Sequence, residues 1–170
     1  MTAAKEHVAS QNFDAAWTEA IEHAYERRAR QLWEYGRRLD LDPSSAEDAM
    51  QEVFARALRL PGVRRPDNLD AWLFRSLHNY SMDQHRRERS VRLLHSSEPV
   101  ISADEADRLA LWQEVDQLPL RQRQAIYLRY RAGLDYLSIA SVLGISEQGA
   151  RGNVFRAMAH MRERMGERNE

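Results

Sequence analysis

The sequence predicts an all-α protein of two small helical domains joined by a flexible acidic linker. Apolar residues recur at three- and four-residue spacing along most of the 170 residues, and no alternating strand pattern persists. This periodicity fails in one serine-containing stretch, residues 89–103. We therefore expect one domain over residues 12–90, a linker over residues 91–103 and a second domain over residues 104–166.

Three helices are predicted in the first domain. An imperfect apolar stripe predicts the first helix over residues 13–39. The second begins at Ser44, because Ser44 and Glu47 have the spacing of a capping box, and it ends before Pro61. Asn68 then stands where the N-cap of a third helix is expected, and that helix runs to the end of the domain.

Four helices are predicted in the second domain. Ser102 and Glu105 repeat the capping-box spacing and open the first of them. Pro119 suits the first turn of the next helix, since its fixed backbone angle matches a helix start. The last two helices cover residues 136–143 and 147–165.

The turn between the last two helices is Gly144-Ile145-Ser146, and a three-residue turn with glycine is typical of a helix-turn-helix motif. Ser146 is the expected cap of the second helix. In such motifs the second helix enters the major groove of DNA. The side chains that we expect to face DNA there are Gln148, Arg151, Asn153, Phe155 and Arg156. An ordinary helical hairpin is the alternative interpretation of this pattern.

A basic face is predicted on the third helix of the first domain. Its members share one side of the helix or extend it: Arg75, Asn79, Met82, Arg86 and Arg87. The loop before this helix adds Arg64 and Arg65. A basic stripe that carries an amide suits phosphate contacts together with a polar base contact. The alternative is a solvated helix face on which Asp83 pairs with a nearby arginine.

A charged face is also predicted on the second helix. It is formed by Asp48, Gln51 and Glu52, with Arg56 following at a spacing that allows an ion pair with Glu52. Two interpretations remain open for it. The face is either a plain solvated surface or a docking surface for a partner protein.

The net charge of −1, from 25 basic and 26 acidic residues, argues neither for nor against nucleic acid as a partner. The distribution of charge is more informative, because residues 121–168 carry nine arginines against four acids. The second domain is therefore the more basic part of the chain.

Several classes of function are excluded or disfavoured. The absence of cysteine excludes disulfides, thiolate zinc sites and cysteine nucleophiles. The six histidines are scattered and are interpreted as surface residues, and no glycine-rich phosphate loop is present. We expect no catalytic residue, no metal site and no cofactor, so the protein is not expected to be an enzyme. No signal peptide or apolar span is recognisable, which predicts a cytoplasmic protein without membrane insertion.

Six short segments carry a resemblance to a known family. Those of the first domain are Asp42–Arg59, Ala71–Asn79 and Asp83 with Arg86-Arg87, and those of the second are Leu118–Ala125, Leu134–Ala140 and Leu143–Ser146. The first group resembles domain two, and the second group domain four, of bacterial RNA polymerase sigma factors of the extracytoplasmic-function (ECF) group. The two matches cover nearly the whole chain, in the order of the family.

This resemblance implies an alternative sigma factor with three partners: core RNA polymerase, promoter DNA and an anti-sigma factor. Domain two would hold the polymerase through Asp48, Gln51 and Glu52. It would open the −10 element with the loop over residues 61–69 and the basic face around Asn79. Domain four would read the −35 element through its last helix.

The chain departs from the family pattern in the last helix, where Gly152 and Asn153 replace a basic pair. This favours an altered −35 sequence. It also keeps open a sigma-like decoy that binds an anti-sigma protein without driving transcription. Trp72 and Asn79 argue against the decoy, because a decoy has no need of a DNA-melting face. A helix-turn-helix transcriptional regulator is a further alternative, but it leaves Asp48 and its neighbours unexplained.

Overall fold

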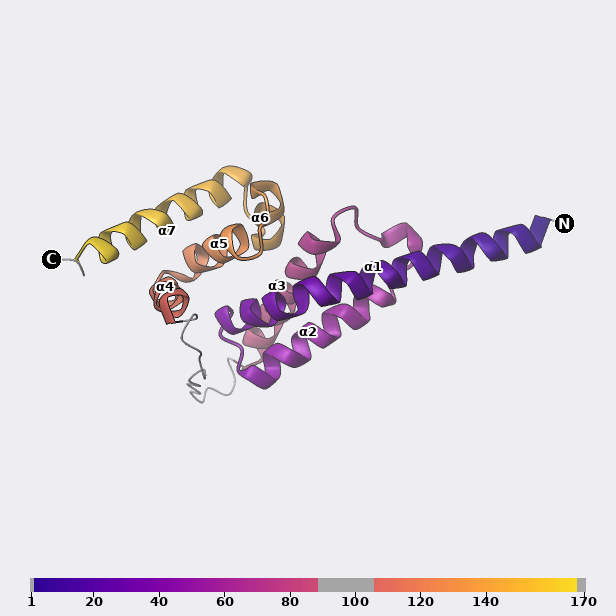
Figure 1. The fold of residues 1–170 in the computed structure, drawn as a ribbon, viewed down its shortest axis with the longest axis horizontal. Coiled ribbons are helices and arrows are strands. Elements are labelled where there is room, and N and C mark those ends of the chain that lie inside the picture. The colour runs from indigo at the N-terminus through magenta and orange to yellow at the C-terminus, as the bar shows by residue number, and fades with distance from the viewer. Residues whose placement is uncertain (1, 89–105, 168–170) are drawn as a thin grey trace.

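The computed structural model describes residues 2–88 and 106–167, and their regular structure is entirely helical (Figure 1). The elements in chain order are α1 (Thr2–Arg38), α2 (Pro43–Leu58), the 3-10 turn η1 (Gly62–Arg64), α3 (Leu69–Glu88), α4 (Ala106–Asp116), α5 (Leu120–Tyr130), α6 (Tyr136–Leu143) and α7 (Glu147–Glu167). The predicted all-α class is confirmed. The predicted linker over residues 91–103 and the predicted cap formed by Ser102 and Glu105 lie outside the described residues.

Helix α1 begins at Thr2, not at Phe13 as predicted from the apolar stripe. The stripe reports where a helix has a buried face, whereas residues 2–12 hold three alanines with one lysine, one glutamate and one glutamine. These are good helix formers, and the segment has no periodic apolar stripe. The start of a helix that extends beyond the core therefore gives no periodic signal.

The cap of α2 is Asp42, so the predicted capping box of Ser44 and Glu47 is wrong. The Asp42 carboxylate accepts hydrogen bonds from the backbone N–H of Ser44 at 3.0 Å and of Ser45 at 3.1 Å. Pro43 occupies the first helical position, where its missing N–H costs nothing. The hydroxyl of Ser45 also donates to Asp42, and these hydrogen bonds lower the pKa of the Asp42 carboxyl.

Two other predicted caps are confirmed. Asn68 Oδ1 accepts from the Ala71 N–H at 2.9 Å, and Ser146 Oγ accepts from the Gly149 N–H at 3.0 Å. Asp135 caps α6 by accepting from the Ser138 N–H at 2.7 Å, a cap that was not predicted. Gly144 ends α6 with a φ of 63°, a left-handed conformation that glycine adopts without strain.

Helices α1 and α2 lie side by side and approach closely at Gly36 (Figure 1). A Cβ atom at Gly36 would lie 3.1 Å from the Cβ of Ala46, tighter than ordinary packing. The small residues therefore fix the spacing of the two helices. Helix α3 packs against both of them and completes the first domain.

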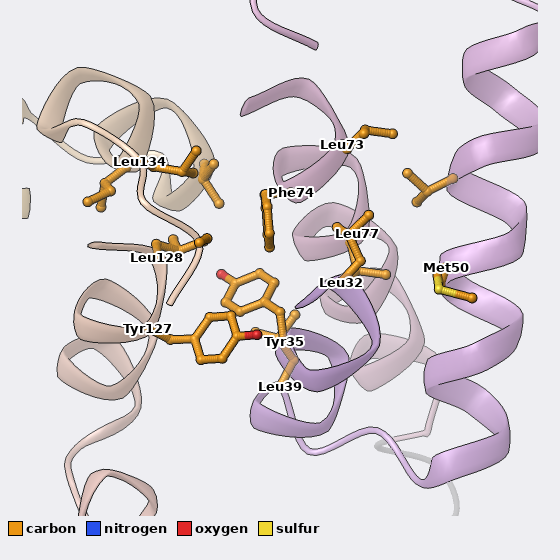
Figure 2. Close-up of a cluster of buried hydrophobic side chains, with 14 of the residues drawn as sticks. Leu32, Tyr35, Leu39, Met50, Leu73, Phe74, Leu77, Tyr127, Leu128 and Leu134 are labelled. Carbon is orange, nitrogen blue, oxygen red and sulfur yellow. The ribbon is translucent and has the colours of Figure 1, made fainter. Parts of the chain in front are cut away.

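The main hydrophobic core does not stop at the boundary between the two halves of the chain. Leu32, Tyr35 and Phe74 from the first half belong to the same buried cluster as Tyr127 and Leu134 from the second. Figure 2 shows Tyr35 and Tyr127 next to one another, and their rings stack with centroids 5.6 Å apart. The two predicted domains thus pack as one body through this cluster.

Within residues 2–88 and 106–167, no helix combines the length and apolar character that crossing a bilayer requires.

Candidate nucleic-acid interface

The charged face of α2 is exposed, as predicted. The opposite side of this helix is buried and apolar, which turns Asp48 and Gln51 to solvent. Glu52 pairs with Arg56 at 2.7 Å and with Arg59 at 3.7 Å. The hydrogen bond from Arg56 lowers the pKa of the Glu52 carboxyl. Asp48 makes no ion pair within the described residues, so its full charge remains available to a partner.

The two arginines of the loop before α3 have different surroundings. Arg64 is exposed, whereas the Arg65 guanidinium lies 5.0 Å from the centre of the Trp17 ring and its Nε donates to the Leu60 carbonyl at 3.3 Å. Trp17 is itself held by a hydrogen bond from its Nε1 to the Ala57 carbonyl. Arg65 therefore braces the loop, and Arg64 is the freer of the two for a phosphate contact. Val63, at 95% exposure, is an apolar residue at the same loop that sequence reasoning missed.

Helix α3 presents the predicted basic face to solvent. Arg75, Asn79 and Arg86 are exposed, and Met82 is half-buried beside them. Within the described residues, the one ion pair of Arg86 is a long contact of 3.5 Å with Asp83. Arg87 falls in the last turn of α3, and its side chain lies outside the described part of the chain. The amide of Asn79 and the guanidinium groups of Arg75 and Arg86 thus remain accessible along one side of α3.

His78, interpreted from the sequence as a surface residue, is buried on the other side of α3. Its Nδ1 lies 3.2 Å from the Tyr35 hydroxyl, and it is 8% exposed. Burial, aided by the positive charge of Arg121, lowers the pKa of His78 to about 4, so the ring is neutral at physiological pH. The prediction was wrong because the sequence around a histidine on a helix does not show whether another helix covers that face.

The exposed face of α7 carries Gln148, Arg151, Phe155 and Arg156. Phe155 is 71% exposed, a large apolar side chain left in water beside charged neighbours. Asn153 differs from the prediction, because its Nδ2 donates to the Gly149 carbonyl of its own helix at 2.9 Å and the residue is half-buried. Four of the five predicted residues therefore share an accessible face.

Arg151 has a defined position on this face. Its Nε and Nη2 donate to the Glu147 Oε1 at 3.2 and 2.6 Å. Its guanidinium carbon lies 4.4 Å from the centre of the Tyr136 ring, and the guanidinium of Arg129 lies 4.8 Å from the same ring. Helix α6 thus supplies an aromatic support for a residue of α7.

The two halves of the chain are joined by polar contacts around the shared core. Arg131 forms an ion pair with Glu34, and the Tyr127 hydroxyl donates to the Gln31 carbonyl at 2.8 Å. Asn68 Nδ2 donates to Ser138 Oγ at 3.2 Å, which links the start of α3 to α6. The structure therefore brings the α3 basic face and the helix-turn-helix motif into one compact body, an arrangement that the sequence did not predict.

Family models match the two halves separately. The model described as Sigma-70 region 2 matches residues 24–91, and the model described as Sigma-70, region 4 matches residues 108–161.

Curated relatives extend over most of the chain. The ECF RNA polymerase sigma factor SigL of Mycobacterium tuberculosis is 30% identical over 151 residues, which are 81% of this chain and 84% of the relative. The ECF RNA polymerase sigma factor SigM of the same species is 27% identical over 152 residues, which are 86% of this chain and 78% of the relative.

Two solved structures share the fold. The sigma factor RpoE from Bartonella quintana, in complex with the anti-sigma factor NepR, has a TM-score of 0.69 at 24% identity and covers 85% of this chain and 96% of its own. CnrH, in complex with the cytosolic domain of CnrY, has a TM-score of 0.64 at 23% identity and covers 94% and 96%.

Proposed function

This chain belongs to the ECF group of bacterial RNA polymerase sigma factors, and from that premise we propose that it binds core RNA polymerase and directs promoter-specific transcription initiation. The observation that carries the proposal is the presence of both sigma regions in one chain, each with an exposed polar helix face. The catalytic chemistry of transcription belongs to the core enzyme, so this chain needs no catalytic residue, metal or cofactor of its own. It would act in the cytoplasm, where polymerase and DNA are found.

The polymerase would dock on the α2 face. Asp48, Gln51 and Glu52 form a short polar surface backed by a fully packed apolar side, so the helix is rigid where it is exposed. The ion pairs of Glu52 with Arg56 and Arg59 hold one carboxylate in place. A basic patch on the partner would complement this surface, and charge complementarity of this kind favours fast and selective association.

The −10 element would be opened by α3 and the preceding loop. Exposed Arg75, Arg86 and Arg64, extended by Arg87, would follow the phosphate backbone. Asn79 would read an unpaired base through its amide, which can both donate and accept hydrogen bonds. Val63 would add an apolar surface next to the displaced strand.

The −35 element would be read by α7 in the major groove. Gln148, Arg151 and Phe155 lie on one side of the helix, and Arg156 is placed toward the phosphate backbone. Asn153 contributes to this site indirectly, by holding its own helix.

Reading both elements requires the two halves to separate. Helix α3 contacts α6, and α6 contacts α7, so the two DNA-facing surfaces lie on a single compact body. Elements named for positions −10 and −35 are separated by about 25 base pairs, or roughly 85 Å of duplex. The packed arrangement would therefore be the form of the free protein, and the form bound to polymerase and promoter would be open.

An anti-sigma factor is the remaining proposed partner. The RpoE structure that shares this fold holds an anti-sigma factor, and we extend that type of partner to this chain. Such a protein would compete with the polymerase for the exposed faces of the packed form.

The experiment that tests the proposed function is run-off transcription with core polymerase and the full-length chain on genomic DNA fragments. We expect defined transcripts that core polymerase alone does not make. Binding to an anti-sigma protein without any promoter-specific transcript would favour the decoy. Gly149, Gly152 and the bonding of Asn153 to its own helix would then explain the weakened DNA-reading helix.

A further inference from the structure

The side chain of Arg151 has more fixed partners than that of Arg156 on the same exposed face of α7. Glu147 binds the lateral edge of its guanidinium, formed by Nε and Nη2, and Tyr136 lies under its face. Arg156, in contrast, makes a single 3.3 Å contact with the amide oxygen of Asn153 and has no carboxylate partner within the described residues. The two arginines are one helical turn or so apart but have different electrostatic surroundings.

These contacts leave one edge of the Arg151 guanidinium unoccupied. A guanidinium has five N–H donors, and Glu147 takes those on the Nε side. The end-on edge, made by Nη1 and the outer hydrogen of Nη2, keeps its donors. Two parallel N–H groups of this kind match the O6 and N7 acceptors that guanine presents in the major groove.

The Glu147 contact also makes Arg151 a poor phosphate anchor. The Nη2 to Oε1 distance is 2.6 Å, so Arg151 and Glu147 together carry less net charge than Arg156, which has no carboxylate partner within the described residues. A residue that binds phosphate works through its net charge, whereas a residue that reads a base works through the direction of its donors. Arg156 fits the first role, and Arg151 fits the second.

We propose that Arg151 reads a guanine of the −35 element, and that Glu147 and Tyr136 are the positioning residues that orient it. The inference rests on the proposed function, because it specifies how the α7 face of a sigma factor selects DNA. Tyr136 belongs to α6 and would not touch the base. The Tyr136 ring acts by fixing the orientation of the Arg151 guanidinium plane. The Arg129 guanidinium lies 4.8 Å from the centre of the same ring and helps to keep the ring in place.

The test is transcription by the holoenzyme from a promoter library with randomised −35 bases. We expect the wild type to prefer a G·C pair at one position by about 5- to 150-fold, the range of a good bidentate contact. Arg151→Ala should abolish that preference. Arg151→Lys should weaken the preference less than Arg151→Ala does, because the lysine ammonium can still donate to O6 or N7 but lacks the planar pair of donors.

The positioning residues have their own readout. Glu147→Gln and Tyr136→Leu should each reduce the preference at that position by about 2- to 5-fold, and Tyr136→Phe should retain it, since the ring remains. Arg162→Ala, an exposed arginine about three turns further along α7, is the matched control and should leave base preference intact. A second arm places 7-deazaguanine at the preferred position. Loss of N7 should weaken the wild type but not Arg151→Ala.

The outcomes separate this inference from the proposed function. If Arg151→Ala lowers transcription from all library members equally and the preferred bases stay the same, Arg151 is a phosphate contact and the inference fails alone. If Tyr136→Leu reduces activity but not selectivity, Tyr136 supports the fold and not the base contact. If the wild type yields no promoter-specific transcript, the proposed function fails and the inference fails with it.

Discussion

Glu34 of α1 and Arg131, the residue after α5, are 97 positions apart in the chain and form a two-point ion pair. Arg131 Nε lies 2.8 Å from Glu34 Oε2, and Arg131 Nη2 lies 2.9 Å from Oε1. Burial raises the pKa of the Glu34 carboxyl, but the hydrogen bond and charge of Arg131, with hydrogen bonds from Tyr127 and Arg30, outweigh burial and leave the pKa below its usual value. This pair fastens the two sigma regions to one another.

Glu34→Gln should destabilise the packed form by about 1–3 kcal/mol, because it removes the charge of a well-aligned, partly buried pair and leaves Arg131 with a weaker partner. The measurement is urea unfolding of the full-length chain. Glu52→Gln is the matched control, since it removes the same charge from an exposed pair on α2 and should cost under about 0.5 kcal/mol. Equal effects of the two variants would show that the contact between the halves contributes little to stability.

A disulfide between the two halves should block transcription reversibly. Asn68 and Ser138 are in side-chain contact at 3.2 Å, and the natural chain contains no cysteine, so Asn68→Cys with Ser138→Cys introduces a single pair. We expect the oxidised double variant to lose run-off transcription and to regain it on reduction, because both promoter elements can be read only when the halves separate.

The two single cysteine variants control for the loss of the Asn68 cap, which costs about 1 kcal/mol. Full activity of the oxidised, locked protein would contradict the proposed opening.

Acidification should destabilise the protein through His78. Its pKa is lowered to about 4, so between the ordinary histidine pKa of 6.5 and that value the unfolded chain binds a proton that the folded chain does not. Stability is therefore full above pH 6.5 and falls as the pH drops toward 4. From pH 7.5 to 5 the loss should be about 1–2 kcal/mol.

His78→Gln keeps a polar partner for the Tyr35 hydroxyl and removes this titration, so its unfolding free energy should vary less over the same pH range. His23→Gln, at an exposed position on α1, is the matched control and should follow the wild type. Parallel pH curves for wild type and His78→Gln would show that the buried ring does not control acid stability.

Reversing charge on α2 should weaken polymerase binding. Asp48→Lys with Glu52→Lys changes an exposed and a half-buried carboxylate one helical turn apart and leaves the buried side of the helix intact. Loss of complementarity should raise the Kd for core polymerase by at least about tenfold. Glu22→Lys with Glu26→Lys has the same spacing and charge change on α1 and serves as the control. Undiminished pull-down by the folded α2 variant would remove that face from the interface.

Asn79→Ala and Arg86→Ala should slow promoter opening more than they weaken initial binding. Asn79 would lose a polar contact with an unpaired base, a loss of about 1–3 kcal/mol, and Arg86 a neighbouring phosphate contact. Fluorescence of 2-aminopurine in the −10 element reports opening. The defect should shrink on a template with a pre-melted bubble. Gln117→Ala, which removes an exposed amide after α4, is the control, and wild-type opening rates in both variants would leave the α3 face without a role in melting.

Elements that depend on neighbours along the chain can be predicted from the amino-acid sequence. The caps at Asn68 and Ser146 and the bounds of α6 follow from local hydrogen bonding and local periodicity, and both were predicted correctly. Periodicity also predicts the exposure of Arg75, Asn79 and Arg151, because a helix that buries one apolar stripe must turn the opposite side to water.

Which of these residues make further contacts depends on how the helices pack against one another. Arg65 lies against Trp17 and Arg151 against Tyr136, and His78 is covered by α1, although nothing adjacent in sequence distinguishes them from exposed residues. The contact of Tyr35 with Tyr127 joins residues from opposite halves of the chain. Periodicity predicts that one face of a helix is buried. It does not predict which other helix packs against that face, and the contacts above depend on that packing.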